Sequence, residues 1–258
     1  MTTVTRHLSS LEDMKQYPKT LYALGDQTLL DRPKVSIVGT RRPSTYTKNM
    51  THALAQALAN RGVVVVSGAA MGVDAIAHLG AGAMSTIAVM ANSLDIHYPS
   101  VNRTLILEIE QKGLVLSQFP PTFKARSWSF VVRNELVVAL GEVLIVAEAD
   151  LNSGSMRSVE YALKMGREIY VLPHNIDESR GTNQLLEEGL AKPIYNIEKF
   201  ASRYGSVPSD RSVIKDEFFY FCQGVPTLDE AIAKFEDRVY EAELEGMIII
   251  ENGLVRLS

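Results

Sequence analysis

Five turns between an expected strand and an expected helix carry the residue types that suit binding of an anion. Each turn contains Gly, Ser, Thr or Asn, and they lie at Gly39 to Ser44, Ser67 to Asp74, Asn92 to Asp95, Asn152 to Ser155 and Gly181 to Asn183. A helix N-terminus offers unpaired N–H groups and roughly half a positive charge, so several converging turns can form a phosphate pocket. Any one such turn is equally consistent with a simple helix cap.

The first turn contains more than a cap needs, because Arg41 and Arg42 follow Gly39 and Thr40 closely, ahead of Ser44. Arginine binds phosphate through two parallel hydrogen bonds and can lie flat on a base. The alternative is a solvated pair of charges. The sequence GTRRPST lacks the Gly-Lys-Ser/Thr ending of a P-loop, and no GxGxxG follows the first or second expected strand. ATP hydrolysis and nicotinamide chemistry therefore lose their main support.

A second concentration of candidate residues is PPTFKARSWSFVVRNE. Here Lys124, Arg126 and Arg133 are interleaved with Phe123, Trp128 and Phe130. Cations that track the backbone and rings that stack on bases are typical of a surface for single-stranded nucleic acid. The competing interpretation is an amphipathic helix whose aromatic side chains enter the core.

Catalytic combinations are sparse, and we assign no catalytic residue and no metal site. The five histidines show no HExxH or other metal spacing, and the single Cys222 lies in the apolar run FFYFC, as a buried structural cysteine would. Asp74 and His78 are four residues apart on an expected helix, which favours a structural contact over an acid–base pair. Asp95, Glu148 and Glu160 could serve a hydrolase as acids, without any visible pairing.

The elements that must position these residues alternate between strand and helix. Strands are expected near 35–38, 63–67, 86–90, 114–117, 143–148, 169–172 and 193–195, and helices near 46–59, 74–83, 102–112, 131–140, 155–165 and 183–189. The continuous β-branched runs indicate strands buried on both faces. The pattern predicts an α/β fold, a Rossmann-like, doubly wound and mostly parallel sheet, whose ligands bind beyond the strand C-termini. Between Arg32 and Val73 there are six basic residues and no acid, so an anionic ligand is expected.

The chain is predicted to contain a large domain at 1–204, a linker at 205–212 and a small domain at 213–258. Residues 1–34 carry helical signals and are interpreted as a lead-in packed on the sheet. Three short helical patterns and a hairpin around Asn252-Gly253 indicate a miniature winged-helix-like domain. Residues 201–258 carry a net charge of −5, whereas residues 1–200 sum to +1, so the two parts differ in electrostatic character.

Composition is that of an ordinary globular protein, with 46% hydrophobic and 22% charged residues among 258. The N-terminus lacks an apolar core of signal-peptide length, and no apolar run reaches about 18 residues. A cytoplasmic location, without contact with a membrane, is the expectation.

An ordered set of motifs resembles the DprA/Smf family, the DNA-processing protein A of natural transformation. In family order they are YPKTLYALGD, IVGTRRPSTY, VVSGAAMGVDAIAH, TIAVMANSLDIHYP, LSQFPP, FVVRNELVVAL, AEADLNSGS, GREIYVLP and GTNQLLEEG, which together span about Tyr17 to Tyr195. The resemblance implies an extended Rossmann fold and a non-enzymatic homodimer without a cofactor. Such a protein binds and protects incoming single-stranded DNA and loads RecA onto it.

By position, the resemblance implies a set of residues at or near the strand: Gly39, Thr40, Arg41, Ser44, Ser67, Gly68, Asn102, Phe130, Arg133, Asn134, Ser153, Gly154 and Ser155. We add Arg42, Lys124 and Arg126 from their composition and spacing. The chain departs from the family pattern at Met71 and Glu135, where Arg is common, at Gln118 in place of Glu, and at Tyr46-Thr47 in place of Tyr-Gly. The two missing arginines concern the strength of DNA binding.

Two other functions compete with single-strand binding. One is a nucleotide-processing enzyme related to the lysine-decarboxylase-like phosphoribohydrolases, whose PGGxGTxxE turn has its nearest counterpart here in NSGSMRSVE, with Glu160 at a suggestive distance. The other is a regulatory module that senses a small nucleotide. The C-terminal domain is acidic where a duplex-reading winged helix needs a basic helix, which favours a protein-interaction or regulatory role for it.

Overall fold

The computed structural model describes residues 1–207, 217–244, 247–251 and 253–257. Contacts divide the chain into two compact units, Met1–Ser206 and Val207–Ser258, and each is described by itself. Most of the linker predicted at 205–212 lies outside the described residues, as do Ile214 to Asp216 of the first helical pattern expected in the small domain.

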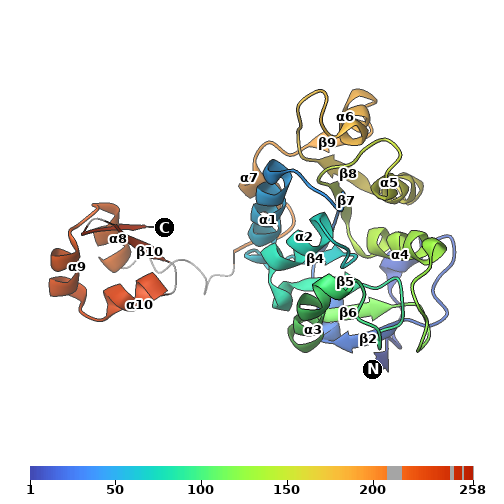
Figure 1. Ribbon diagram of the computed structural model, residues 1–258, viewed down its shortest axis with the longest axis horizontal. Helices are drawn as coiled ribbons and strands as arrows, with labels where there is room; N and C mark the ends of the chain where they lie inside the picture. The colour runs from blue at the N-terminus through green and yellow to red at the C-terminus, as the bar shows by residue number, and fades with distance from the viewer. Residues whose placement is uncertain (208–216, 245–246, 252, 258) are drawn as a thin grey trace. The chain divides into compact units, whose positions relative to one another are not determined.

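The first unit is built on one mixed sheet (Figure 1). Its strands are β1 (Thr2–Thr3), β2 (Tyr22–Gly25), β3 (Lys34–Val38), β4 (Val64–Ser67), β5 (Thr86–Val89), β6 (Leu114–Ser117), β7 (Val143–Val146), β8 (Glu168–Val171) and β9 (Lys192–Pro193). They lie in the order β1-β2-β6-β5-β4-β3-β7-β8-β9, and all pairs from β6 to β9 are parallel. The prediction of a doubly wound, mostly parallel α/β fold is confirmed.

Helices cover both faces of this sheet. They are α1 (Thr45–Ala59), α2 (Val73–Ala81), α3 (Arg103–Lys112), α4 (Ser127–Leu140), α5 (Gly154–Lys164), α6 (Arg180–Glu187) and α7 (Ile197–Ala201). Alternate residues of each strand face opposite layers: Val35 and Ile37 pack with α1 and α2, whereas Val38 and Val66 pack with α4 and α5. Because both layers are apolar, Val63 to Val66 are buried without interruption.

The lead-in at residues 1–34 differs from its helical prediction. Only short 3-10 helices form there, at Ser9–Leu11 and Gln27–Asp31. The segment LYALGD supplies β2, which joins the sheet antiparallel to β6 with Ala23 opposite Leu116. The short apolar run could be a helix or a strand by pattern alone, and pairing with the free edge of β6 decides it.

Two further boundaries differ from the predictions. Helix α4 begins at Ser127, four residues before the predicted start, so Phe130 lies on the same helix as Arg133. The last strand is the pair Lys192–Pro193, and Tyr195 lies beyond it, largely exposed. A proline cannot donate to a ladder, which suits β9 to the sheet edge.

The second unit contains α8 (Glu217–Gln223), α9 (Leu228–Phe235) and α10 (Arg238–Leu244), followed by the hairpin β10 (Ile248–Glu251) and β11 (Leu254–Leu257). A small core of Phe218, Cys222, Ala231, Val239, Ala242, Ile248 and Val255 holds it together. Thr227 and Glu230 form a capping box at the start of α9. Cys222 is buried, as its apolar surroundings in the sequence indicate.

Candidate nucleic-acid interface

A pocket lies where the strand order reverses. From β3 the chain winds through β4, β5 and β6 on one side, and then returns to place β7 against the other side of β3. In an open α/β sheet a crevice forms beyond the strand ends at this switch point. The pocket here has a volume of about 560 Å³. It brings together ten of the predicted residues: Gly39, Thr40, Arg41, Gly68, Phe130, Arg133, Asn134, Ser153, Gly154 and Ser155.

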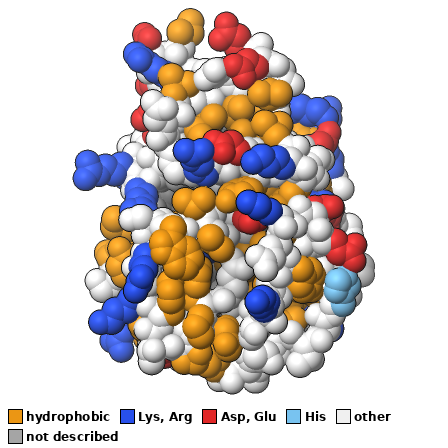
Figure 2. Space-filling view, turned by 90° about the vertical axis from the view of Figure 1, so that its right-hand side faces the viewer, with side chains coloured by type: hydrophobic (Ala, Val, Ile, Leu, Met, Phe, Trp, Pro, Cys, Tyr) orange, Lys and Arg blue, Asp and Glu red, His pale blue; other side chains and the backbone are white. Residues whose placement is uncertain are grey.

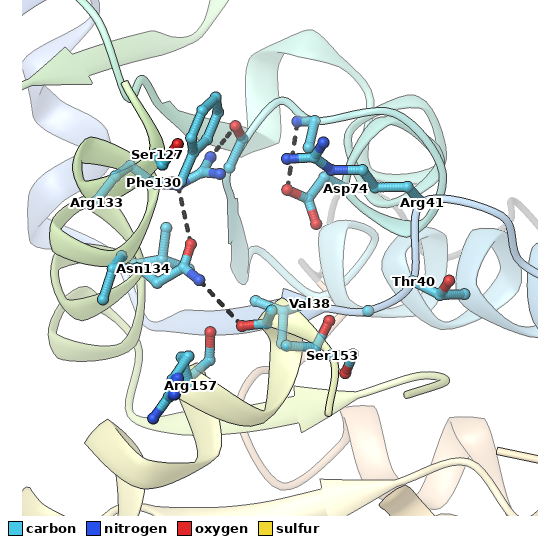
Figure 3. A pocket seen from close by; sticks show the side chains of 18 residues that line it. Val38, Thr40, Arg41, Asp74, Ser127, Phe130, Arg133, Asn134, Ser153 and Arg157 are labelled. Atoms are coloured by element: carbon cyan, nitrogen blue, oxygen red, sulfur yellow. Dashed lines mark hydrogen bonds between the residues drawn. The ribbon is translucent and has the colours of Figure 1, made fainter. Parts of the chain in front are cut away.

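The exposed Arg41 and the half-buried Phe130 lie against each other in the site (Figure 3). The Cζ atom of Arg41 lies 5.4 Å from the centroid of the Phe130 ring, a cation–π arrangement. The Tyr98 ring lies 6.1 Å from the Phe130 ring on the side of a smaller neighbouring pocket. A guanidinium and an aromatic ring held against each other offer a phosphate ligand and a stacking surface at one place.

Arg133 lines the buried side of the pocket and is only 4% exposed. Its guanidinium donates to the carbonyl oxygens of Gly68 and, at 3.0 Å, Val89, while its Nε donates to Asn134 Oδ1 at 3.1 Å. These bonds occupy the group that was expected to contact DNA. Arg133 is therefore placed to hold the turn after β4, and its charge acts from below the pocket surface.

Asp74 supplies the negative partner of this buried arginine. The carboxyl is 7% exposed, and one of its oxygens accepts from Ala70 N–H at 3.3 Å. Burial raises the pKa of Asp74, and the positive charge of Arg133 acts in the opposite direction. A Cβ atom at Gly68 would collide with the Arg133 guanidinium, so a larger residue here would displace that group from its bonds. Asp74, Arg133 and the Gly68 turn thus form one packed support.

Two predicted residues support this turn from outside the pocket lining. Asn102 donates from Nδ2 to the carbonyls of Ala69 and Ala70, at 3.0 Å each. Ser67 is fully buried and donates to the Ile37 carbonyl at 2.7 Å. Their side chains are engaged within the protein, so the structure places them as positioning residues.

The backbone of the first turn is also engaged. Thr40 N–H donates to the Glu148 carbonyl at 2.8 Å, and Ser44 N–H donates to the Glu148 carboxylate at 3.0 Å. The N–H of Arg42 bonds to the Thr40 hydroxyl at 3.2 Å, and Ser44 caps α1 by accepting from Thr47 N–H. These backbone N–H groups, which were expected to bind phosphate at this turn, are therefore already bonded to other groups of the chain.

The remaining predicted residues lie outside the lining of this pocket. Arg42 and Ser44 are exposed beside it. Lys124 and Arg126 are exposed on the segment before α4, where the half-exposed Trp128 packs edge-on against Phe119 and Phe123. Figure 2 views the first unit from the side of α4 and α5 and shows Lys and Arg side chains scattered among apolar ones. Trp128 therefore packs partly in an aromatic cluster, as a core residue would, and is partly open to solvent, as a DNA-contacting residue would be.

The sequence reasoning missed several lining residues, among them Ser127, Val131, Arg157 and Ser158. Helical spacing could have identified them. Ser127, Phe130, Val131 and Asn134 recur at i, i+3, i+4 and i+7 of α4, and Ser158 lies four residues after Gly154 on α5. These residues were missed because the helix was predicted to begin at residue 131, whereas α4 begins at Ser127.

The residues that depart from the family pattern have separate locations. Met71 is 45% exposed and lines the smaller pocket with Tyr98. Glu135 faces the opposite way and accepts from Lys15 N–H at 2.7 Å, which fastens the lead-in to α4. Glu160, the candidate acid of the phosphoribohydrolase alternative, pairs with Arg157 at 2.8 Å and does not line the pocket. Among the residues described, no group of His, Cys, Asp and Glu is arranged to hold a metal ion.

His78 is buried close to this support but does not pair with Asp74, contrary to expectation. Thr86 donates its hydroxyl to the Val65 carbonyl, so His78 Nδ1 donates to Thr86 Oγ1 at 2.7 Å. The Nε2 atom is then unprotonated and has no hydrogen-bond partner. Burial, assisted by the charge of Arg133, lowers the pKa of His78 from 6.5 to about 3.

This buried imidazole predicts acid sensitivity. Between pH 6.5 and pH 3 the unfolded chain binds a proton at His78 that the folded chain does not, so the free energy of unfolding falls as pH falls. The slope from this group is about 1.4 kcal/mol per pH unit. Urea denaturation of wild type and His78→Gln at pH 7, 6, 5 and 4 measures it. Equal pH slopes for the two proteins would contradict the assignment.

Comparison with known proteins identifies relatives of the first unit. Residues 4–205 match the family model described as DNA recombination-mediator protein A. The chain is 34% identical over 193 residues to the DNA processing protein DprA of Bacillus subtilis, covering 73% of this chain and 65% of the relative. It is 36% identical over 183 residues to that of Streptococcus pneumoniae, covering 69% and 64%. The matches span between half and about two thirds of these curated relatives, including Protein Smf of Synechocystis at 50%.

Two solved structures are similar as well. DNA processing protein A of Helicobacter pylori, whose structure was described for its single-stranded DNA binding mode, superposes with a TM-score of 0.76 at 46% identity, covering 78% of this chain and 94% of that one. DprA of Streptococcus pneumoniae superposes with a TM-score of 0.72 at 33% identity, covering 77% and 71%. On the family match, these identities and the shared fold, the chain belongs to the DprA/Smf family of DNA recombination-mediator proteins.

Proposed function

We propose that this protein is a non-enzymatic single-stranded DNA-binding protein that protects incoming DNA during natural transformation and recombination. The observation that carries the proposal is the pair Arg41 and Phe130 at the mouth of the switch-point pocket, 5.4 Å apart and next to the N-terminus of α5. Phosphate binding and base stacking at the same place suit a strand whose bases are unpaired. A duplex keeps its bases stacked inside and could not use the ring.

The lining of the pocket supports binding more than catalysis. Asp74 is its acidic residue, and that carboxyl is buried against Arg133 and Ala70 N–H, where it is poorly placed to exchange protons with a substrate. Glu160 is paired outside the lining. The phosphoribohydrolase alternative therefore has less support than single-strand binding. Incubation with nucleoside monophosphates should release no free base.

The similar proteins also support single-strand binding. The similar Helicobacter pylori structure was described for its binding of single-stranded DNA, and the curated relatives are named DNA processing proteins. The family resemblance supports three further parts of the proposal: binding as a homodimer, loading of RecA and a cytoplasmic location. RecA-driven strand exchange on DNA already covered by a single-strand-binding protein would test the loading role. No acceleration by this protein would contradict it. Among the residues described, no helix has the length and apolar character needed to cross a membrane.

The central test is a salt titration of DNA binding. On single strands the logarithm of affinity should fall linearly with the logarithm of salt concentration, by about 0.7 for each phosphate contacted. Fluorescence anisotropy with labelled oligothymidylate at four salt concentrations measures this slope. A duplex of the same length should bind more weakly at every concentration. A salt-independent interaction, or tighter binding of the duplex, would contradict the proposed function.

The second unit is proposed to bind a protein partner or to regulate, and not to read duplex DNA. Its third helix, α10, is flanked by Glu236 and Asp237 and exposes Glu241 and Glu243, which would repel phosphates. Deletion of residues 207–258 is therefore expected to leave the single-strand affinity within about threefold of wild type at the same salt. Anisotropy on the truncated chain checks this. Loss of binding on truncation would show that the second unit belongs to the DNA site.

A further inference from the structure

Four helices begin at or beside the switch-point pocket, α1, α2, α4 and α5. Asp74 lies in the first turn of α2, and Arg126 and Ser129 form a capping box at α4. The remaining two N-termini, those of α1 and α5, are in different states.

The N-cap residue of α1 is bonded to a carboxylate from within the chain, because Ser44 N–H donates to Glu148 Oε2 at 3.0 Å. The backbone carbonyl of the same glutamate accepts from Thr40 N–H. A carboxylate at a helix N-terminus satisfies the N–H groups and the dipole that would otherwise attract a phosphate.

The N-terminus of α5 has no such carboxylate. This helix has 11 residues and no acid in its first turn, and its N-cap residue Ser153 makes no side-chain capping bond. The hydroxyls of Ser153 and Ser158 are both buried without a hydrogen-bond partner, and Ser158 is only 1% exposed. Both residues line the pocket. Unsatisfied buried hydroxyls are costly, and a serine hydroxyl changes direction by rotation about a single bond.

Neighbouring contacts fix this helix end in place. Asn134 of α4 donates to the Gly154 carbonyl at 3.4 Å and accepts from Arg133, so α5 is tied to the buried support (Figure 3). Arg157 stands exposed at the pocket rim, paired with Glu160. The N-terminal turn of α5 is therefore held open, without an anion of its own, within the same pocket as Arg41.

We infer that Glu148 acts as a built-in substitute for phosphate at α1 and thereby assigns the bound phosphate to the N-terminus of α5, where Ser153 and Ser158 supply hydroxyl donors. The ligand is a phosphodiester of a nucleic-acid strand, and this inference rests on the proposed function. Glu148 is a specificity-determining residue, because its charge decides which of two similar helix ends receives the phosphate. Ser158 is a binding residue that the sequence motifs did not indicate.

The test measures affinity and salt slope for oligothymidylate in three variants and two controls. Ser153→Ala with Ser158→Ala should weaken binding by about tenfold or more, because hydrogen bonds to a charged oxygen are lost. Glu148→Ala frees the Ser44 N–H for a second phosphate and should steepen the slope by about 0.7. Glu148→Gln keeps an acceptor for Ser44, so it should tighten binding without steepening the slope to the same extent. Ser202→Ala and Glu187→Gln, outside the pocket lining, are matched controls.

Failure of the inference and failure of the proposed function give different results. If the serine double variant binds like wild type, or both Glu148 variants keep the wild-type affinity and slope, the inference is wrong even though the protein binds DNA. If wild type shows no salt-dependent strand binding, the proposed function itself fails. Thymidine monophosphate serves as a further competitor: equal affinity for the free nucleotide and the strand would indicate a nucleotide sensor and overturn both. Unchanged thermal melting of the variants confirms that they remain folded.

Discussion

Replacing Arg133 with methionine is expected to lower the free energy of unfolding by about 3–5 kcal/mol, because two buried carbonyls lose their donor and the positive charge that favours ionised Asp74 is removed. The guanidinium bonds to the carbonyls of Gly68 and Val89 and offsets the charge of Asp74. Methionine fills a similar volume but leaves the Asp74 carboxylate and two carbonyls without these donors. The urea midpoint at pH 7 measures the loss.

A control and a rescue make this prediction specific. Arg157→Met removes an exposed arginine on α5 and should change stability by no more than about 0.5 kcal/mol. Asp74→Leu combined with Arg133→Met should be more stable than Arg133→Met alone, since the unpaired charge is gone. A small effect of Arg133→Met, comparable to that of Arg157→Met, would show that Arg133 is not part of the support.

Loss of both Arg41 and Phe130 should weaken single-strand binding by about 100-fold. The guanidinium supplies a charge-assisted contact to phosphate, and the ring supplies a stacking surface for a base. Because the two groups touch, with Cζ 5.4 Å from the ring centroid, the single effects of Arg41→Ala and Phe130→Ala should not add. Anisotropy with oligothymidylate at fixed salt measures all three proteins.

Arg42→Ala is the matched control for this pair. Arg42 is the neighbouring arginine of the same charge, but it lies outside the pocket lining. Its removal should reduce affinity only a few-fold through the general field of the surface. If Arg42→Ala and Arg41→Ala weakened binding equally, the pocket would not be the centre of the DNA site.

The fold class was accessible from sequence because its signals are local. Val63 to Val66 form an uninterrupted β-branched run, and only a strand covered on both faces accommodates such a run. The LYALGD segment was not accessible in this way. Its short apolar run fits a helix or a strand, and the free edge of β6 that makes it a strand lies about 90 residues further along the chain.

The candidate site was predictable in its position but not in the roles of its members. Arg133 and Arg41 are both arginines near candidate turns, yet one is buried against carbonyls and the other is exposed. That difference depends on where α4 begins and which side of it faces β4 and β5. The absence of acidic residues between Arg32 and Val73 was also misleading as a sign of an anion site, because some of its basic residues lie far from the pocket. Lys34 and Arg61 lie at the opposite sheet edge, where Lys34 bonds to the Leu30 carbonyl and Arg61 pairs with Glu198.

The position of β7 has a consequence for the order in which the protein can form during synthesis. β3 lies in the middle of the sheet, and it pairs with β4 soon after it leaves the ribosome, but Ser36 reaches its other partner only when Leu144 has been made. Until then one edge of an apolar strand has unpaired N–H and C=O groups, which can pair with another chain. The pocket also lacks α5 until residues 154–164 have been made. We therefore expect nascent chains that end before β7 to aggregate readily, and chains that end before residue 158 to bind no strand.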